Sequence, residues 1–311
     1  MARPMVLQNV VRWALIVFVC FVYFASVLPS VAMTSTLFVG GACIEVVSDP
    51  SSPTLPLEDA LVWVKAAAES VRIYYGVFPI SPISIHITPF RGRGIQNGMA
   101  FGTEKGGRIT IRVGSKTSST EFASDWMLTH EMVHLAFPSV AEEHHWIEEG
   151  IATYVEPIAR VRAGHLASER MWADLVRDMP QGLPQKGDRG LDRTHTWGRT
   201  YWGGAIFCLL ADLEIRRQTK NTRGLEHALR AILQAGGNIR SDWDLEEALQ
   251  VGDRATGTRV LGKLYEEMKD KPIPVDLDVL WIELGVYSEG QKVRIDERAR
   301  FAAIRRAITG E

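Results

Sequence analysis

The alternation of apolar and polar residues predicts strands in the first part of the chain. Apolar residues occupy every second position at 42–47, 83–88 and 108–113, which is typical of strands with one buried face. Residues 57–75 carry apolar side chains at helical spacing and lie between the first two of these strands. A mixed sheet with a helix packed on it is therefore expected before residue 137.

Apolar positions at helical spacing dominate the second part of the chain and predict a helical lobe. A segment rich in proline and glycine at 180–190 interrupts this pattern, and long connections of this kind are often functional. Together the two parts predict an α+β fold with an N-terminal lobe at 33–137 and a helical lobe at 138–311. The expected helices span residues 146–162, 166–178, 202–217, 225–235, 245–251, 260–269 and 277–284.

The most apolar stretch of the chain lies at residues 13–28. Arg3 and Arg12 precede this run, and its length falls between a signal-peptide core and a full membrane span. Small residues at 30–32 offer a cleavage site. Because the basic residues come before the run, we expect the rest of the chain to be exported across the cytoplasmic membrane. Residues 1–32 are then a cleaved signal peptide or a retained membrane anchor, and the folded part is periplasmic or otherwise extracytoplasmic.

The charge of the chain gives no indication of a polyanionic partner. Its 311 residues include 35 Lys and Arg and 37 Asp and Glu, for a formal net charge of −2. A nearly neutral chain has no electrostatic basis for nucleic-acid binding, so no nucleic-acid partner is expected. Five arginines between residues 294 and 306 are interspersed with acidic residues, and we expect them to lie on a solvated helix face.

Two cysteines follow the apolar N-terminal segment, Cys43 and Cys208. In an oxidising compartment they can pair. Cys208, however, falls in the apolar helix expected at 202–217, where a buried free thiol is the commoner outcome.

Residues 130–134 read His-Glu-Met-Val-His and contain the main candidates for metal binding and catalysis. On a helix, His130 and His134 lie one turn apart on the same face, so both imidazoles can reach a single Zn²⁺. Glu131 beside them is placed to act as a general base toward a zinc-activated water. The pattern predicts a catalytic zinc site on the helix that ends the N-terminal lobe.

A catalytic zinc site takes three protein ligands and leaves one position for water. Residues 146–154 read as a helix that follows a short polar link, so an acidic residue in its first turn would face the histidine pair. Glu148 and Glu149 are both candidates, and His144 and His145 lie close enough to be considered. Alternatively, these four residues belong to a solvated loop and helix start, where the helix dipole favours acidic residues.

The histidine motif followed by Trp-Ile-Glu-Glu-Gly-Ile-Ala at 146–152 resembles the gluzincin metallopeptidases of the MA clan. In that family the third zinc ligand is the Glu directly before the Gly, so the resemblance implies Glu149. A second stretch, Tyr-Trp-Gly-Gly-Ala at 201–205 with Asp212 and an Ile-Arg pair downstream, is similar to the glycyl aminopeptidase branch. The tyrosine of that branch hydrogen-bonds the reaction's oxyanion, a role that falls on Tyr201. The resemblance implies a zincin or thermolysin-like catalytic fold.

The chain departs from the larger aminopeptidases in two respects. Gly203 stands where the branch has a lysine, and residues 97–102 occupy the place of the exopeptidase signature Gly-x-Met-Glu-Asn without its Glu. The chain is also too short for the large accessory domains of those enzymes. A minimal, stand-alone peptidase MA-like domain is therefore expected.

In zincins, the strand that borders the cleft pairs with the backbone of the substrate. Within the glycine-rich stretch 92–107, Gly98, Met99 and Ala100 are the candidates for this substrate-binding edge, by the logic of β-augmentation. A mobile surface loop is the alternative interpretation of the same residues.

The expected function is an exported zinc metallopeptidase acting on a peptide or protein substrate. His130, His134 and Glu149 would hold the zinc. Glu131 would be the general base, and Tyr201 would stabilise the oxyanion. Two other classes remain open: a non-catalytic binding module that keeps the zincin fold, and a zinc hydrolase of a non-peptide amide or ester.

Overall fold

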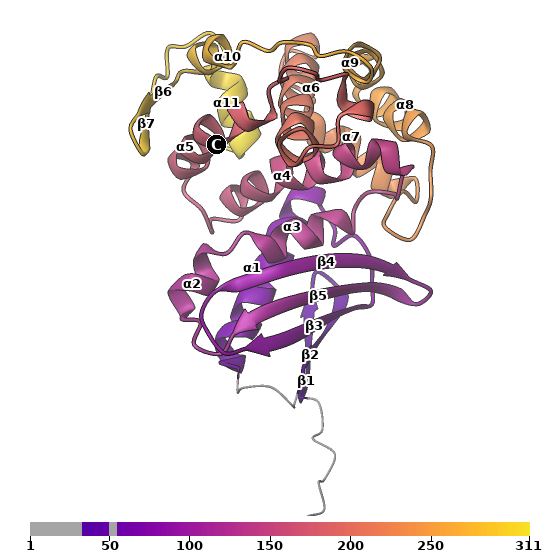
Figure 1. Ribbon diagram of the computed structural model, residues 1–311, viewed down its shortest axis with the longest axis vertical. Coiled ribbons are helices and arrows are strands. Elements are labelled where there is room, and N and C mark those ends of the chain that lie inside the picture. Colours follow the sequence, from indigo (N-terminus) through magenta and orange to yellow (C-terminus); the bar gives the residue numbers. More distant parts are fainter. Residues whose placement is uncertain (1–32, 50–54) are drawn as a thin grey trace, which may run out of the picture. The chain divides into compact units, whose positions relative to one another are not determined.

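The computed structural model describes residues 33–49 and 55–311, so the apolar run at 13–28 lies outside the described residues. The residues described from Met33 onward form one compact unit. In Figure 1 a five-stranded sheet lies at one end of this unit and a larger group of helices at the other. The predicted α+β fold, a mixed sheet followed by a helical lobe, is confirmed.

The sheet has the strand order β1-β2-β3-β5-β4. Its three central strands run parallel, whereas β1 and β4 are antiparallel to their neighbours and form the two edges. An edge strand keeps one row of backbone groups free of ladder hydrogen bonds. The strands are β1 (Met33–Val39), β2 (Ala42–Ser48), β3 (Ile83–Phe90), β4 (Ile95–Thr103) and β5 (Gly106–Gly114).

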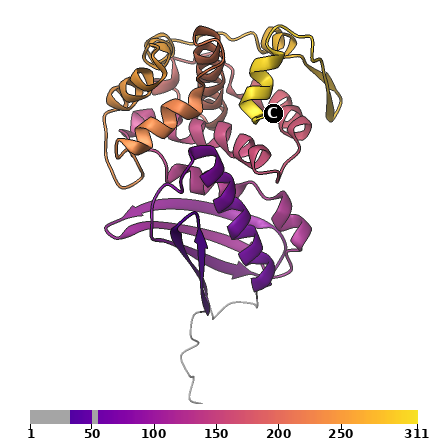
Figure 2. The ribbon, with the colours of Figure 1, turned by 180° about the vertical axis from the view of Figure 1, so that it is seen from behind.

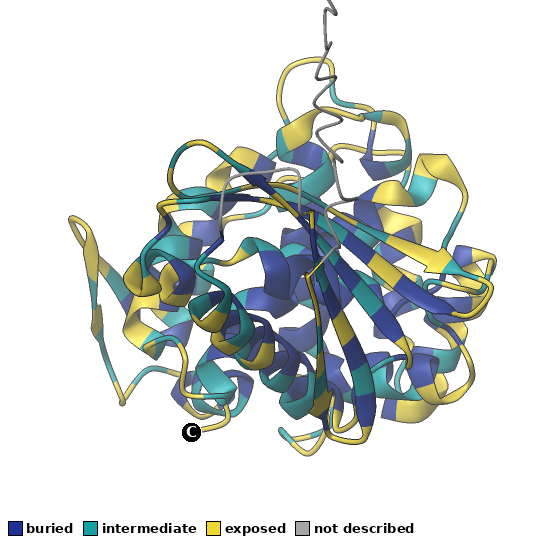
Figure 3. Cartoon of the chain, turned by 90° about the horizontal axis from the view of Figure 1, so that it is seen from below, coloured by how far each residue is buried: buried dark blue, intermediate teal, exposed yellow. Residues whose placement is uncertain are grey.

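Alternation of side chains decides which face of the sheet is buried. Ile85 and Ile87 of β3 pair with Ile109 and Ile111 of β5, and all four are at most 1% exposed. Helix α1 (Leu57–Tyr75) joins β2 to β3 and packs on the sheet, as Figure 2 shows. Figure 3 shows the buried residues concentrated in the central strands and on the inner helix faces. Full burial of such a side chain typically stabilises the fold by about 1.5–3 kcal/mol.

The helices that follow the sheet share one hydrophobic cluster with it. Leu128, Trp146 and Phe207, from three different helices, are each at most 2% exposed within that cluster. The core therefore runs without interruption from the sheet into the helical part. The helices are α2 (Ser119–Ser124), α3 (Met127–His134), α4 (His145–Arg162), α5 (Ser168–Asp178), α6 (Gly204–Gln218), α7 (Leu225–Gln234), α8 (Leu245–Thr256), α9 (Val260–Met268), α10 (Leu277–Leu284) and α11 (Ala302–Thr309).

Several short elements have no counterpart in the expectations from the sequence. They are β1, α2 and a hairpin of β6 (Val286–Glu289) and β7 (Lys292–Ile295). Each is seven residues long or shorter, so a periodic pattern has little length in which to emerge. α1 and α10 have the predicted bounds.

Of the C-terminal arginines expected on a solvated helix face, Arg294, Arg298 and Arg300 are exposed but precede α11, and Arg305 on α11 is buried. Arg305 is 2% exposed, and its guanidinium donates hydrogen bonds to the carbonyl oxygens of Leu284 and Asp296. It also pairs with Glu297, as Arg306 does. This arginine therefore joins α11 to the end of α10 and to the segment after β7.

Cys43 in β2 and Cys208 in α6 are both free thiols, and Cys208 is buried. Burial raises the pKa of Cys208, so this thiol stays protonated. Among the described helices, none combines the length and the apolar character needed to cross a membrane.

Candidate metal centre

Helix α3 carries the two histidines and begins at a side-chain cap. The Asp125 carboxylate accepts a hydrogen bond of 3.1 Å from the backbone N–H of Leu128 and one of 2.9 Å from the Trp63 indole of α1. This fixes where the helix starts and therefore which residues face α4. His130 is 5% exposed, and the rings of His130 and His134 lie 4.8 Å apart.

Helix α4 brings an acidic residue to this pair, and two glycines set its position. A Cβ at Gly150 would collide with the backbone of Gly204, and a Cβ at Gly204 would collide with Gly150 and the Trp146 carbonyl. Helices α4 and α6 thus cross with their backbones in contact. This close crossing explains the glycine that follows Glu149 in the sequence motif.

Three side chains converge where α3 meets α4. Glu149 Oε2 lies 3.1 Å from His130 Nε2 and 3.5 Å from His134 Nε2. The three residues each offer a ligand atom, all within 4.8 Å of one another. Zinc with bonds of about 2.0–2.1 Å in tetrahedral geometry spaces its ligand atoms about 3.3–3.4 Å apart. The donor types and their spacing therefore fit zinc.

The other residues considered as ligands point elsewhere. Glu148 accepts a hydrogen bond from the backbone N–H of Val140, and its second oxygen lies 2.8 Å from His145 Nδ1. His144 Nδ1 lies 3.0 Å from an oxygen of Asp192. Of the two adjacent acids, the structure thus places Glu149 against the histidine pair and Glu148 against the preceding loop.

His145 supports the ligand rather than joining the cluster. Its Nε2 lies 3.3 Å from Glu149 Oε1, the oxygen that does not face the other two histidines. It therefore links Glu149 to Glu148, and hydrogen bonds to both acids raise the pKa of His145 to about 10. Partners of this kind fix the orientation of a ligand. From the sequence alone, only the proximity of His145 to Glu149 in the chain indicates this role.

Burial and hydrogen bonds shift the pKa values of the cluster residues. Burial alone would raise the pKa of Glu149, but hydrogen bonds from His130, His134 and His145 hold it well below its usual range. Burial lowers the pKa of His130. An ionised carboxylate beside a neutral imidazole is the combination that binds a cation.

Glu131 lies between α3 and the edge strand β4. It is 8% exposed, and its carboxylate accepts a hydrogen bond from the backbone N–H of Ala100. Any side chain at Gly98 would crowd it, because a Cβ there would lie 2.7 Å from Glu131 Oε1. Burial raises the pKa of Glu131 to about 7. A carboxylate with a pKa near neutrality can both take up and release a proton.

The edge strand β4 borders a cavity of about 900 Å³ that opens onto the cluster. Gly98, Met99 and Ala100 line it together with the three cluster residues, and they lie in strand β4 rather than in a loop, at or just after a register shift between Gln96 and Met99. The far end of the strand is closed, since Arg240 donates hydrogen bonds to the carbonyl oxygens of Thr103 and Glu104. No sequence pattern predicts this contact between Arg240 and β4.

Tyr201 also lines the cavity, on a π-helical turn at Arg199–Gly203 that precedes α6. π-Turns are rare and frequently occur at functional sites. A buried ion pair of 2.7 Å between Arg199 and Asp188 joins the turn to the preceding connection. Burial and the nearby Glu149 raise the pKa of Tyr201 to about 12, so its hydroxyl stays protonated and can donate a hydrogen bond.

The chain shares its fold with zinc metallopeptidases of known structure. An aminopeptidase N family protein from Idiomarina loihiensis matches with a TM-score of 0.63 and 12% identity, over 82% of this chain and 49% of that one. An M1 zinc metallopeptidase mutant from Deinococcus radiodurans matches with a TM-score of 0.51 and 14% identity, over 78% and 53%. A two-domain M1 zinc metallopeptidase mutant bound to L-arginine matches with a TM-score of 0.51 and 16% identity, over 78% and 54%.

The chain therefore spans about half the length of these proteins. No protein-family model matches the sequence, and no curated protein is significantly similar to it. The likenesses confirm the expected zincin-like architecture, whereas the glycyl aminopeptidase branch stays a prediction.

Proposed function

We propose that this chain is a zinc-dependent metallopeptidase that hydrolyses peptide bonds. The observation that carries the proposal is the convergence of one Glu149 oxygen on the Nε2 atoms of His130 and His134. A second support is the edge strand β4, which borders the same cavity. The fold shared with M1 zinc metallopeptidases agrees with this chemistry.

Zinc bound by these three residues would supply Lewis-acid activation of a water molecule and of the substrate carbonyl. Glu131 would accept the proton of the attacking water at its carboxylate and pass it to the departing amine. The Ala100 N–H and the absence of a side chain at Gly98 hold that carboxylate against β4. The Tyr201 hydroxyl would donate a hydrogen bond to the oxyanion, and a single such donor is worth about 3 kcal/mol.

The edge of β4 would bind the substrate as an added strand. The Gly98 N–H donates to Met127 Sδ and the Ala100 N–H to Glu131. The other backbone groups of Gly98, Met99 and Ala100 would therefore pair with an extended peptide, as in β-augmentation. The resulting partner is a peptide or protein rather than a small ester, because a strand edge recognises a repeating backbone.

We also propose that the enzyme works outside the cytoplasm, on the strength of the basic residues and the apolar run in segment 1–32. A reporter that is active only in the periplasm, fused after residue 40, should be active in a Gram-negative host. Activity of a cytoplasm-only reporter at the same position would contradict export.

The decisive test of the enzyme is Glu131→Gln, which keeps the size of the side chain and removes the base. Turnover of a peptide library by the zinc-loaded protein should fall at least about a hundredfold, while the zinc content stays the same. Tyr201→Phe should lower kcat more than it raises KM, since the hydroxyl contacts charge that develops in the transition state. Unchanged turnover in Glu131→Gln would contradict the proposal, and peptide binding without turnover in the wild type would indicate a non-catalytic module.

A further inference from the structure

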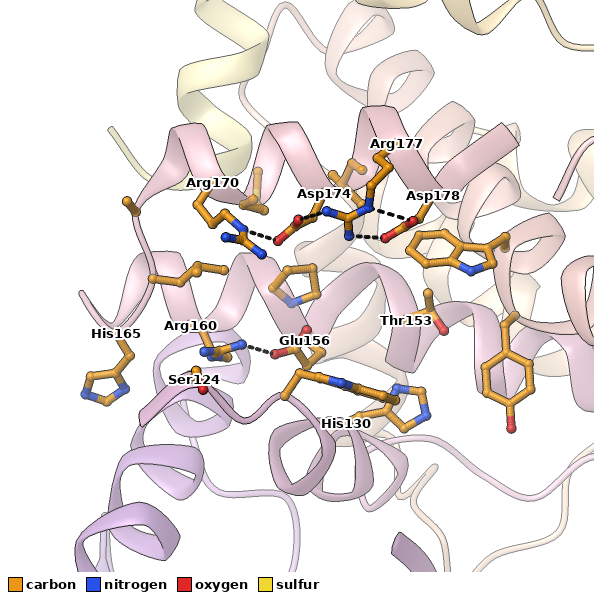
Figure 4. A pocket seen from close by; sticks show the side chains of 18 of the residues that line it. Ser124, His130, Thr153, Glu156, Arg160, His165, Arg170, Asp174, Arg177 and Asp178 are labelled. Atoms are coloured by element: carbon orange, nitrogen blue, oxygen red, sulfur yellow. Dashed lines mark hydrogen bonds and ion pairs between the residues drawn. The ribbon is translucent and has the colours of Figure 1, made fainter. Parts of the chain in front are cut away.

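A second cavity of about 810 Å³ adjoins the metal centre and is not needed for the chemistry described above. It shares His130 and Tyr201 with the first cavity. In Figure 4, Arg170, Asp174, Arg177 and Asp178 follow α5 along one side, Thr153, Glu156 and Arg160 follow α4 along another, and His130 lies at one end. Because Glu149, Thr153, Glu156 and Arg160 fall on one face of α4, the cavity begins one helical turn from the metal ligand.

A row of four aromatic rings forms one wall of this cavity. Trp126 meets His130 edge to face, with ring centres 5.5 Å apart. The His130 ring stacks on Tyr201 at 6.2 Å, and Tyr201 stacks on Trp197 at 5.6 Å. All four residues line the cavity. The row therefore runs from one tryptophan through a metal ligand and the proposed oxyanion donor to the second tryptophan.

The two tryptophans at the ends of the row are unusually accessible. Trp126 is 50% exposed and Trp197 is 60% exposed, whereas Trp63, Trp146, Trp172 and Trp281 are at most 5% exposed. Exposed indole faces beside a cavity are typical of ligand recognition, because aromatic side chains gain most from stacking when they are desolvated. Met99 and Phe101, which are also exposed, border the first cavity.

The charged residues around the second cavity are paired with one another. Glu156 binds Arg160 at 3.0 Å, and Arg170 binds Asp174 at 2.8 Å. Arg177 lies between Asp174 and Asp178 and bonds both. Three carboxylates and three guanidinium groups thus balance among the described lining residues. A cavity with balanced charges selects neither an acidic nor a basic side chain.

We propose that this cavity binds an aromatic side chain of the substrate, next to the bond that is cleaved, and that Trp126 and Trp197 select it by stacking. The proposal rests on the proposed peptidase function and names its substrate class. The volume lies within the range of about 300–1,000 Å³ typical of small-ligand sites, so even an indole side chain fits. An aliphatic side chain would fill the space but would lack the binding energy of stacking on the two tryptophan rings.

The test compares Ala-rich peptides that differ at one position, which carries Phe, Leu, Lys or Glu. With the zinc-loaded full chain, kcat/KM for Phe should exceed that for Leu about fivefold, and that for Lys or Glu about a hundredfold. Trp126→Ala and Trp197→Ala should each reduce the ratio of Phe to Leu to near one, mainly through a higher KM for the Phe peptide. Trp197→Phe should restore most of the ratio. Ile282→Ala, which removes a 53% exposed side chain on α10, is the matched control and should leave the ratio unchanged.

A binding measurement separates this proposal from the peptidase itself. Saturation-transfer NMR with N-acetyl-phenylalanine amide needs no turnover, and it should show contact with the phenyl ring in the wild type and little in Trp197→Ala. If no peptide is cleaved but this contact is seen, the peptidase proposal fails, whereas the proposal that the cavity binds an aromatic side chain is supported. Cleavage without a Phe preference, a preference unchanged in both tryptophan variants, or no phenyl contact in the wild type would overturn the aromatic cavity.

Discussion

Two buried polar clusters contact the same helix, α4, and they differ in how their charge is balanced. Near the end of α4, Asp212 accepts hydrogen bonds from Tyr154 and from Arg216, at 3.0 and 2.7 Å. Arg216 also donates two hydrogen bonds to Glu226, which lies 3.5 Å from Arg162. Two acids and two arginines therefore neutralise one another within the chain.

The cluster at the start of α4 has three acids and, among the described residues, lacks an arginine or lysine partner. Glu131, Glu148 and Glu149 lie around it, and their partners in the described part of the chain are histidines, backbone N–H groups and the Tyr201 hydroxyl. His145 is a cationic partner of Glu148 and Glu149, but its side chain is 51% exposed. Buried carboxylates are stable only with a partner of opposite charge or with strong hydrogen bonds. The first cluster is therefore neutralised by arginines of the chain itself, whereas the second brings two imidazoles and a carboxylate within 4.8 Å of one another, an arrangement that can hold a metal ion.

The largest effect should follow from removing the ligand that joins the two histidines. Purified wild-type protein should hold about one zinc per chain by elemental analysis, and Glu149→Ala should hold almost none, as should His130→Ala and His134→Ala. Glu148→Ala is the matched control and should keep its zinc, because this acid faces the Val140 backbone. Loss of zinc in Glu148→Ala with retention in Glu149→Ala would reverse the roles assigned to the two acids.

The internally balanced cluster should respond in stability and not in metal content. Arg216→Leu leaves Asp212 and Glu226 without their main cation, which should cost about 3–5 kcal/mol in the free energy of unfolding. Arg217→Leu, on the same helix, removes only a pair with Glu214 in which the arginine side chain is 56% exposed, and should cost less than about 1 kcal/mol. Both variants should bind zinc normally. Equal denaturation midpoints for the two would refute the structural role of Arg216.

Substitution of Glu156 should have a smaller effect, which should appear in the pH dependence of the free energy of unfolding. Its burial raises its pKa from 4.5 to about 7, despite the Arg160 ion pair. Between these values the folded state holds a proton that the unfolded state lacks, so this group favours folding at pH 5 and its contribution is lost as the pH rises through 7. The change is at most about 3 kcal/mol. Denaturation at pH 5 and pH 8 should show a weaker pH dependence in Glu156→Gln than in the wild type, with the exposed Glu69→Gln as control.

The sequence predicted the bounds of helices whose apolar positions repeat regularly. The helices at 57–75 and 277–284 have the expected bounds because their apolar positions repeat over two turns or more. The histidine pair was equally readable, since two residues four apart on a helix must share a face.

The remainder depends on contacts between distant residues, which leave no periodic signal. The crossing glycines and the link from Arg240 to β4 each join segments more than fifty residues apart. The π-helical turn that carries Tyr201 is joined to the preceding connection by the buried ion pair of Arg199 with Asp188. The helix propensities of the residues in the turn do not predict this pair. Arg305 was misjudged because it was grouped with the other arginines of 294–306 and the acids among them, whereas its partners include the carbonyl oxygens of Leu284 and Asp296.

The backbone contact between Gly150 and Gly204 bears on how such a chain can diverge. Core side chains elsewhere can be exchanged for others of similar size. Such exchanges change the thermal stability but keep the distance between Glu149 and Tyr201. At the crossing itself no such gradual path exists, since the first methyl group added at either glycine forces the two helices apart. Gradual substitution is therefore blocked at this crossing, directly beside Glu149.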